Sequence, residues 1–345
     1  MNPTDSVDLS LVIPLFNEAE VFPQLIARLD ALIGALAGQK ISTEVVLVDD
    51  GSADRTAELI RQACGRTASP GNYRGITLSR NFGHQLAITA GMHFARGEAV
   101  AILDGDLQDP PEVVAEFYAK LRGEPSAEGR GTFALDVVYA VRQDRKENMI
   151  KRMAYAGFYR LMRRLATVPI PLDSGDFCIM SRRVVNEINA MRERHRFVRG
   201  LRSWVGFRQE AHAYPRAARE AGKSKYTIGK LLKLAFDGIF TFSEKPLQWS
   251  AQFGLLVALC SVGYALYVFI WRFFAKEAVP GFAALAVGLF FLGGVQLMSI
   301  GILGEYIGRI HNEVKGRPLF IVRERFGFAD HPHPSANEAA SMERT

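Results

Sequence analysis

Short apolar runs alternate with amphipathic stretches in the N-terminal part of the chain. The apolar runs are short, unbroken and rich in β-branched residues, which is typical of strands covered on both faces. They are Leu9–Pro14, Glu44–Asp50, Arg74–Ser79, Ala99–Asp104 and Leu135–Val141. The helical stretches between them are Glu18–Leu36, Asp54–Cys64, His84–Ala95 and Pro111–Leu121. This alternation predicts an α/β fold with a mainly parallel sheet.

A different pattern follows near the C-terminus, where Gln252–Trp271 and Phe282–Leu303 contain no charged residue. Each has about the ~20 residues that a helix needs to cross a ~30 Å hydrocarbon layer. The short connection between them predicts a transmembrane hairpin. Lys and Arg gather on the outer flanks, whereas the connection holds only Arg272 and Lys276. The positive-inside bias therefore predicts that both termini and the N-terminal domain are cytoplasmic.

Two amphipathic stretches, Lys146–Leu165 and Tyr226–Phe242, lie between these regions. Packing on a core would explain the apolar face of either one. The basic residues of the second stretch, next to a membrane hairpin, favour binding at the membrane interface. From about Arg325 the chain has no periodicity, which predicts disorder. The expected divisions are 1–225 (catalytic domain), 226–248 (juxtamembrane helices), 249–304 (hairpin, with spans 252–271 and 282–303) and 305–345 (cytoplasmic C-terminal segment).

Charge and cysteine content exclude several classes of protein. The net charge of +6 comes from 42 Lys and Arg against 36 Asp and Glu. The basic residues do not form the aromatic-interleaved stripe of a nucleic-acid-binding protein, so we expect no nucleic-acid partner. The 3 cysteines are far apart and match no metal or redox spacing. The first residues lack the basic and apolar regions of a signal peptide.

Polar residues follow the first four predicted strands where each strand ends. Because parallel strands bring their carboxyl ends to one edge of a sheet, these residues predict a single ligand site. They are Asn17 and Glu18, then Asp49–Ser52, then Arg80 and Asn81, and finally Asp104–Gln108.

The segment Ile102–Glu112 (ILDGDLQDPPE) has three possible interpretations: a solvated turn, an acid/base pair or a metal site. Asp104 and Asp106 are two residues apart, so both carboxylates can face one point beyond the strand, and Gly105 leaves room for a phosphate. Gln108 adds a neutral oxygen. An incomplete set of hard oxygen ligands suits Mg²⁺ or Mn²⁺ whose shell is completed by a diphosphate and water. Asp109, before two prolines, is expected to cap the next helix.

The second polar cluster, Asp49–Ser52, can accept hydrogen bonds from a ribose hydroxyl or a base N–H. A dinucleotide-binding fold would have a glycine-rich turn after the first strand, and LVIPLFNE has none. No Walker A sequence occurs either. A nucleotide bound without a phosphate loop needs another source of positive charge, which a metal ion supplies.

Six ordered motifs carry a resemblance to a known family. They are IPLFNE (Ile13–Glu18), VDDGSADRT (Val48–Thr56), LSRNFGHQLAITAGM (Leu78–Met92), LDGDLQDPPE (Leu103–Glu112), SGDF (Ser174–Phe177) and AGKSKY (Ala221–Tyr226). In order and spacing they resemble glycosyltransferase family 2, and within it the polyprenyl-phosphate hexosyltransferases. The likeness runs from about Leu9 to Gly316.

The resemblance implies a GT-A fold with a nucleotide-sugar donor (a UDP- or GDP-hexose), a divalent metal and a polyprenyl phosphate acceptor. It implies metal and diphosphate binding by the acidic loop, a nucleoside site in the first two motifs, phosphate-binding basic residues and an aspartate near the reacting carbon. The catalytic candidates are Asp176, Asp106 and Arg142, and the metal candidates are Asp104, Asp106 and Gln108. The substrate-binding candidates are Pro14, Asn17, Glu18, Asp49, Asp50, Arg80, Asp104, Arg152, Arg202 and Lys223.

Two departures from related sequences bear on the reaction. The acidic loop reads DGD where many relatives have DAD, and both central residues are small. The Q-x-x-R-W motif of processive polysaccharide synthases is missing, because RGLRSW (Arg199–Trp204) lacks the glutamine. A single transfer is therefore favoured over polymerisation.

A lipid monophosphate, with a second pKa near ~6, is mostly dianionic at neutral pH and hardly needs a general base. Asp176 could then orient the acceptor, bind the sugar or help to position the metal. We expect inverting transfer of one hexose, glucose from UDP-glucose, onto undecaprenyl phosphate at the cytoplasmic face of a bacterial inner membrane. The alternatives are GDP-mannose as donor, another lipid or glycan acceptor, and a non-enzymatic scaffold. A homo-oligomer is left open.

Overall fold

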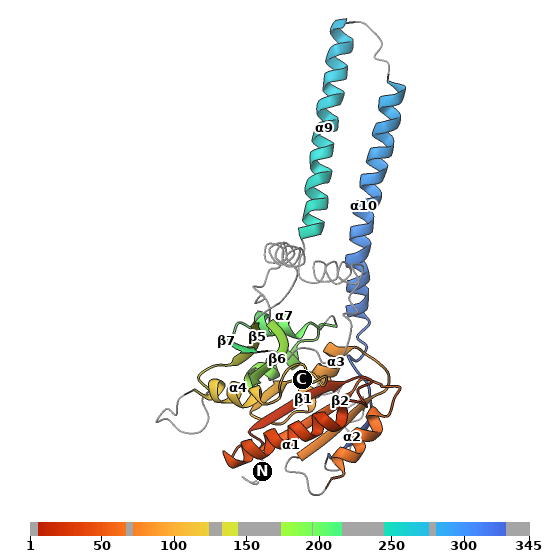
Figure 1. Ribbon diagram of the computed structural model, residues 1–345. Helices are drawn as coiled ribbons and strands as arrows, with labels where there is room; N and C mark the ends of the chain where they lie inside the picture. The colour runs from red at the N-terminus through yellow and green to blue at the C-terminus, as the bar shows by residue number, and fades with distance from the viewer. Residues whose placement is uncertain are drawn as a thin grey trace, which may run out of the picture.

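The computed structural model describes residues 6–66, 72–123, 133–143, 174–194, 196–215, 245–275 and 281–328. In this part of the chain a single mixed sheet forms the domain, and two long helices project from one end of it (Figure 1). The strand order is β7-β5-β6-β4-β1-β2-β3-β8. The strands are β1 (Leu9–Leu15), β2 (Thr43–Asp49), β3 (Asn72–Leu78), β4 (Ala99–Ile102), β5 (Val137–Gln143), β6 (Ser174–Ser181), β7 (Gln209–Pro215) and β8 (Val322–Phe326).

The centre of the sheet is the predicted parallel α/β unit. Strands β4, β1, β2 and β3 are mutually parallel, and each is followed along the chain by a helix or by a loop that leads to one. The four helices are α1 (Phe22–Gly38), α2 (Thr56–Cys64), α3 (His84–Phe94) and α4 (Val113–Arg122). The predicted α/β fold with a mainly parallel sheet is confirmed, and the boundaries of these elements lie within a few residues of the prediction.

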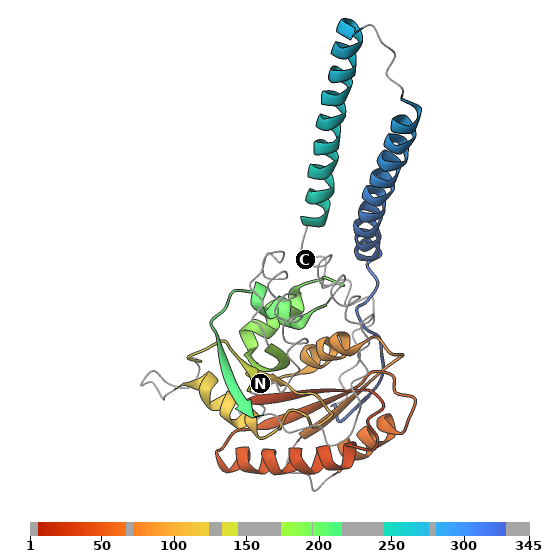
Figure 2. The same cartoon turned by 45° about the horizontal axis from the view of Figure 1, so that its top comes forward.

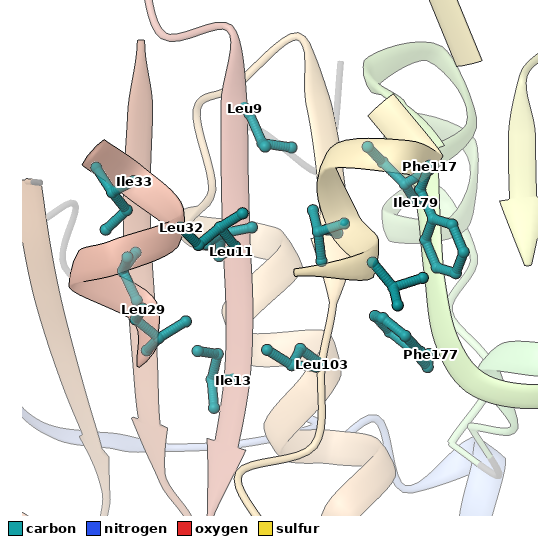
Figure 3. Packing of buried hydrophobic residues seen from close by; sticks show 14 of the residues in the cluster. Leu9, Leu11, Ile13, Leu29, Leu32, Ile33, Leu103, Phe117, Phe177 and Ile179 are labelled. Carbon is teal, nitrogen blue, oxygen red and sulfur yellow. The ribbon is translucent and has the colours of Figure 1, made fainter. Parts of the chain in front are cut away.

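Alternating residues of each central strand supply two cores, one on each face of the sheet. Leu11 and Ile13 of β1 pack toward α1, where Leu29 and Ile33 meet them (Figure 3). Val12, on the other face, belongs to the core under α3. All of these side chains are at most 1% exposed, and each contributes about 1.5–3 kcal/mol by burial.

The other half of the sheet contains antiparallel pairs, which the sequence did not predict. Strand β6 runs antiparallel to β4 and to β5, whereas β7 is parallel to β5. Neither β6 nor β7 was expected to be a strand. Segment β6 begins with the polar residues SGD, which leaves only the short apolar run Phe177–Met180, and β7 (QEAHAYP) is an edge strand without a continuous apolar run. Helices α6 (Arg182–Ala190) and α7 (Val198–Trp204) join them.

The C-terminal segment returns to the domain and forms strand β8 beside β3, in antiparallel pairing. The prediction of disorder from about Arg325 was therefore wrong for the end of this strand. Hydrogen bonds to β3 order the segment, together with an ion pair between Arg61 and Glu324 and the packing of Arg61 over the ring of Phe326. Both contacts are long-range, so periodicity within the segment could not reveal them.

The two long helices are α9 (Lys245–Ala275) and α10 (Phe282–Val314), which lie side by side in both views (Figures 1 and 2). The Ser250 and Ser299 hydroxyls are hydrogen-bonded across the pair at 2.9 Å. The windows Leu247–Trp271 and Phe291–Val314 are each long and apolar enough to cross a membrane, and none of their described side chains is buried. The predicted spans lie inside these helices. The predicted amphipathic stretches at 146–165 and 226–242 lie outside the described residues.

The base of the hairpin contacts the domain through the loop between α6 and α7. The Arg194 backbone N–H donates to the Glu313 carboxylate at 2.9 Å, and the Arg194 guanidinium donates to the Asn312 carbonyl at 3.0 Å. Helix α7 consequently lies on the side of the domain that faces the hairpin (Figure 1).

Candidate active site

A pocket of about 400 Å³ opens at the carboxyl ends of the parallel strands. The pocket lies at the one sheet edge where the polar residues that follow these strands were expected to form a ligand site. Its lining includes Pro14, Glu18, Asp50, His84, Asp104 and Asp106. Five of these were candidates from the sequence, and His84 was not.

Asp49 and Asp50 organise the loops at one end of the pocket. Asp50 accepts the backbone N–H groups of Phe82 and Gly83 at 2.8 and 2.9 Å, which fixes the loop from β3 to α3. Asp49 accepts the N–H of Ser52 at 3.1 Å, and its second oxygen is buried without a hydrogen bond to the described residues. Burial raises the pKa of both carboxyl groups.

Asn17 and Glu18 connect the first loop to the second. Asn17 has a left-handed backbone (φ 55°), its N–H donates to the Ser52 hydroxyl at 2.9 Å, and its side-chain oxygen accepts the Ala53 N–H at 2.8 Å. Burial, together with the charge of Asp106, raises the pKa of Glu18. Asn17 therefore ties two loops together, and Glu18 belongs to the acidic wall of the pocket.

The acidic loop begins beyond β4, which ends at Ile102. Asp106 accepts the Gln108 backbone N–H at 3.1 Å. One oxygen of Asp104 is buried and makes no hydrogen bond to the residues that the structure describes, although His84 Nε2 lies 3.4 Å away. Burial raises the pKa of Asp104 to about 6. A buried, unsatisfied carboxylate oxygen suits an added cation.

Gly105 lines the pocket, and a Cβ on it would lie 2.3 Å from Leu15 Cδ2, so the missing side chain also makes room for the end of β1. One expectation for this loop was wrong. Asp109 does not cap α4, which begins at Val113 without a side-chain cap. It is buried and accepts a hydrogen bond from the Tyr214 hydroxyl, a β7 contact that sequence proximity to the prolines could not reveal.

Asp176 lies at the start of β6 and is surrounded by donors. Arg199 of α7 donates from Nε to one oxygen at 2.9 Å, and Gln85 of α3 donates to the other at 2.9 Å. His84 Nε2 is 3.5 Å from that second oxygen, so His84 lies between Asp176 and Asp104. No role was predicted for His84, Gln85 or Arg199 from the sequence. Position after a strand end was a usable signal for the first two, whereas Arg199 is brought in by α7.

The charges around Asp176 reverse the usual effect of burial. Burial alone would raise the pKa of this carboxyl group, but the contact with His84 and the charge of Arg199 hold it well below its usual range. Burial would likewise lower the pKa of His84, and its contact with Asp176 and the charge of Asp104 raise it instead. Asp176 is therefore an ionised carboxylate with fixed partners.

Neither Arg80 nor Arg202, the two predicted basic residues whose side chains the structure describes, lines the pocket. The Arg80 guanidinium donates to the Asn81 carbonyl at 2.9 Å and packs over the Phe82 ring. Arg202 is completely buried against the Tyr139 ring, and its guanidinium makes no hydrogen bond to the described residues. It lies inside the domain and not on the pocket wall. The backbone of Arg142 is part of β5. The side chain of Arg142, and all of Arg152 and Lys223, lie outside the described part.

Within the described ranges no group of three or more His, Cys, Asp or Glu side chains is arranged to hold a metal ion. Asp104 and Asp106 can offer only part of a coordination shell. An ion at this place would therefore need further ligands from outside these two side chains.

Comparison with known proteins places this site in a family. The sequence model of glycosyl transferase family 2 matches residues 10–188, and that of the GtrB C-terminal hairpin matches residues 245–310. The chain belongs to glycosyltransferase family 2. The family match covers the acidic loop and Asp176, and the hairpin match covers α9 and most of α10. The chain is therefore a glycosyltransferase with a membrane-associated hairpin.

The similar proteins include an uncharacterized glycosyltransferase, YkcC, of Bacillus subtilis (strain 168), which is 41% identical over 93% of this chain and 95% of its own length. The SfII prophage-derived bactoprenol glucosyl transferase of Shigella flexneri is 38% identical over 92% of this chain and 97% of its own. Among solved structures, mannosyl-3-phosphoglycerate synthase from Rubrobacter xylanophilus is 16% identical with a TM-score of 0.42, over 67% of this chain and 71% of that one.

Proposed function

We propose that this glycosyltransferase moves one glucose from UDP-glucose onto a polyprenyl phosphate, undecaprenyl phosphate in bacteria. The observation that carries the proposal is full-length similarity to proteins named bactoprenol glucosyl transferase, from the pocket through the membrane hairpin. Because the hairpin is part of the matched region, the similarity includes the segment that would bring the catalytic domain close to a lipid.

The reaction needs a cation for the diphosphate of the leaving group, and we propose Mg²⁺ or Mn²⁺. Asp104 and Asp106 would hold it, with Gln108 as a further candidate. The unsatisfied buried oxygen of Asp104 supports this assignment. When bound, such an ion stabilises the negative charge that develops on the leaving diphosphate.

Protein residues would hold the rest of the donor. Pro14, Glu18 and Asp50 line the pocket beside the acidic loop and are the candidates for the nucleoside end. We propose direct displacement with inversion at the anomeric carbon. The acceptor phosphate is mostly dianionic at neutral pH. Asp176, whose oxygens already accept hydrogen bonds from Arg199 and Gln85, is then a positioning residue and not a base.

The orientation in the membrane follows from charge. Lys and Arg flank the outer ends of the hairpin, so we propose that the catalytic domain and both termini face the cytoplasm at the bacterial inner membrane. The acidic pocket also has to be on the side where nucleotide sugars are made.

The test incubates the purified chain in detergent with Mn²⁺, undecaprenyl phosphate and a panel of UDP- and GDP-sugars. We expect a lipid-linked sugar with UDP-glucose and inverted configuration in the product. A product with GDP-mannose alone would replace glucose by mannose. Transfer to diacylglycerol or a glycan instead of the lipid phosphate would change the acceptor. Donor hydrolysis without any lipid product would overturn the proposal.

A further inference from the structure

We infer that Arg199, held in place by Asp176, binds the phosphate of the acceptor. This inference rests on the proposed function for the identity of the acceptor, a prenyl monophosphate. No role was expected of Arg199 from the sequence.

The first support is the order of the charged groups across the site. Asp104 lies in the donor pocket, and His84 Nε2 is 3.4 Å from it and 3.5 Å from Asp176. Arg199 contacts the Asp176 carboxylate from Nε at 2.9 Å and from Nη2 at 3.4 Å. The contacts thus run from the acidic loop, which would hold the diphosphate, through His84 and Asp176 to Arg199, and we place the attacking group at the Arg199 end.

The second support is the direction from which a lipid can reach the site. Arg199 is on α7, and the loop before α7 is attached to the end of α10 through Arg194. Figure 1 shows α7 on the side of the domain that faces the hairpin. A phosphate at the end of a membrane-embedded chain would approach the domain from the side on which α7 lies.

The third support is charge. The pocket wall contains Glu18, Asp50, Asp104 and Asp106, which would repel a second anion. The Arg199 side chain is 33% exposed, so it is accessible from the solvent side, and Asp176 fixes its orientation. A guanidinium can bridge two anions because its five N–H donors point along different edges.

Asp176 accordingly acts through Arg199. Its carboxylate is 7% exposed and accepts hydrogen bonds from Arg199 and from Gln85, whose own oxygen accepts the Val198 N–H at 2.8 Å. This network fixes the start of α7 and the guanidinium together. A prearranged arginine loses little entropy when the phosphate binds.

The experiment measures the apparent KM for undecaprenyl phosphate and for the nucleotide sugar in Arg199→Gln and Arg199→Lys. Loss of a charge-assisted hydrogen bond predicts an increase of about 10- to 100-fold in the lipid KM of Arg199→Gln, with the donor KM within about twofold. Arg199→Lys should recover part of the loss. Arg208→Gln, which removes an exposed arginine just after α7, is the matched control and should change neither constant.

Binding of farnesyl phosphate and farnesol to the same variants makes the result independent of turnover. Arg199→Gln should weaken the binding of farnesyl phosphate and leave that of farnesol unchanged. If wild type forms no lipid-linked sugar, the proposed function fails, and farnesyl phosphate binding still decides the role of Arg199. A donor KM that rises while the lipid KM stays constant, or unchanged farnesyl phosphate binding in Arg199→Gln, overturns the inference. Arg199→Lys serves these measurements if the glutamine variant does not fold.

Discussion

Asp104 and Asp176 are two carboxylates on either side of His84, and their surroundings are opposite. Burial raises the pKa of Asp104 to about 6, and one of its oxygens has no hydrogen bond to the described residues. Asp176 is more deeply buried, yet His84 and Arg199 hold its pKa well below the usual range. The two carboxylates are therefore distinguished by their fixed charged partners and not by their burial.

This difference separates two uses of the same side chain. A buried carboxylate without a fixed cation destabilises the empty protein and gains most when a cation arrives. A carboxylate with fixed cations has no comparable gain and instead holds its neighbours in place. Asp104 is thus suited to a removable ion, and Asp176 to a fixed framework.

The largest effect is expected when the acidic loop is changed. Asp106→Ala should lower transfer by at least about 100- to 1,000-fold at every Mn²⁺ concentration, because stabilisation of the leaving diphosphate is lost. The measurement is formation of lipid-linked sugar during titration with Mn²⁺. Glu58→Gln, an exposed acid on α2, is the control and should retain activity. Recovery of Asp106→Ala at high Mn²⁺ would mean that Asp106 only tunes metal affinity.

Removal of the Asp176 carboxylate should have the next largest effect, and it should appear in stability as well as in activity. Asp176→Asn leaves Arg199 with a weaker partner, and we expect the free energy of unfolding to fall by about 2 kcal/mol. Urea unfolding measures this loss, and the lipid KM should rise with it. Normal stability combined with a shifted pH–rate profile would instead identify Asp176 as a base.

The central part of the fold was predictable because its signals are local. Strands β1 to β4 are short apolar runs separated by amphipathic helices, so periodicity found them and the parallel arrangement followed. Strands β7 and β8 have no such signal and β6 has only the short run Phe177–Met180, since the order of all three depends on pairing with distant strands. The position of β8 after a membrane hairpin made it especially hard to predict.

The candidate site was predictable to a similar extent. Asp50, Asp104 and Asp106 follow strands, and the parallel arrangement brings them together. Arg202 was expected to bind substrate but is buried inside the domain, because the sequence of α7 does not reveal which arginine faces inward. Arg199, one turn earlier, is the one that contacts Asp176. Only the packing of α7 on the sheet distinguishes these two residues.

The pH dependence of stability should separate the two carboxylates by sign. The raised pKa of Asp104 means that the folded state binds a proton more tightly, so its contribution to stability falls as pH rises from about 4 to 6. A shift from 3.8 to about 6 corresponds to about 3 kcal/mol, which screening of a partly exposed group reduces to about 1.5 kcal/mol. Metal-free Asp104→Asn should therefore be more stable than wild type at pH 7.

The contribution of Asp176 to stability has the opposite sign. Because its pKa is lowered in the folded state, its ionised form stabilises the protein above the usual Asp range, and this stabilisation is lost as pH falls. Urea unfolding of wild type, Asp104→Asn and Asp176→Asn from about pH 2 to pH 7.5 measures both, because the stabilisation by Asp176 is lost only below the ordinary pKa of an Asp and that of Asp104 changes above it. Mn²⁺ should stabilise wild type at pH 7 and have less effect on Asp104→Asn. An equal effect of Mn²⁺ on both proteins would remove Asp104 from the metal site.

The smallest effect is expected at Gln85, which supports Asp176 without a charge. Gln85→Met keeps the length of the side chain but loses the hydrogen bonds to Asp176 and to the Val198 N–H. We expect a loss of about 1 kcal/mol in the free energy of unfolding and a severalfold increase in the lipid KM, with metal activation unchanged. Because Gln85 contacts Asp176 and no residue of the acidic loop in the described hydrogen bonds, a change in Mn²⁺ activation would show that the two carboxylates are coupled. Unchanged Mn²⁺ activation would mean that the altered contacts of Asp176 do not affect Asp104, although His84 lies between the two carboxylates.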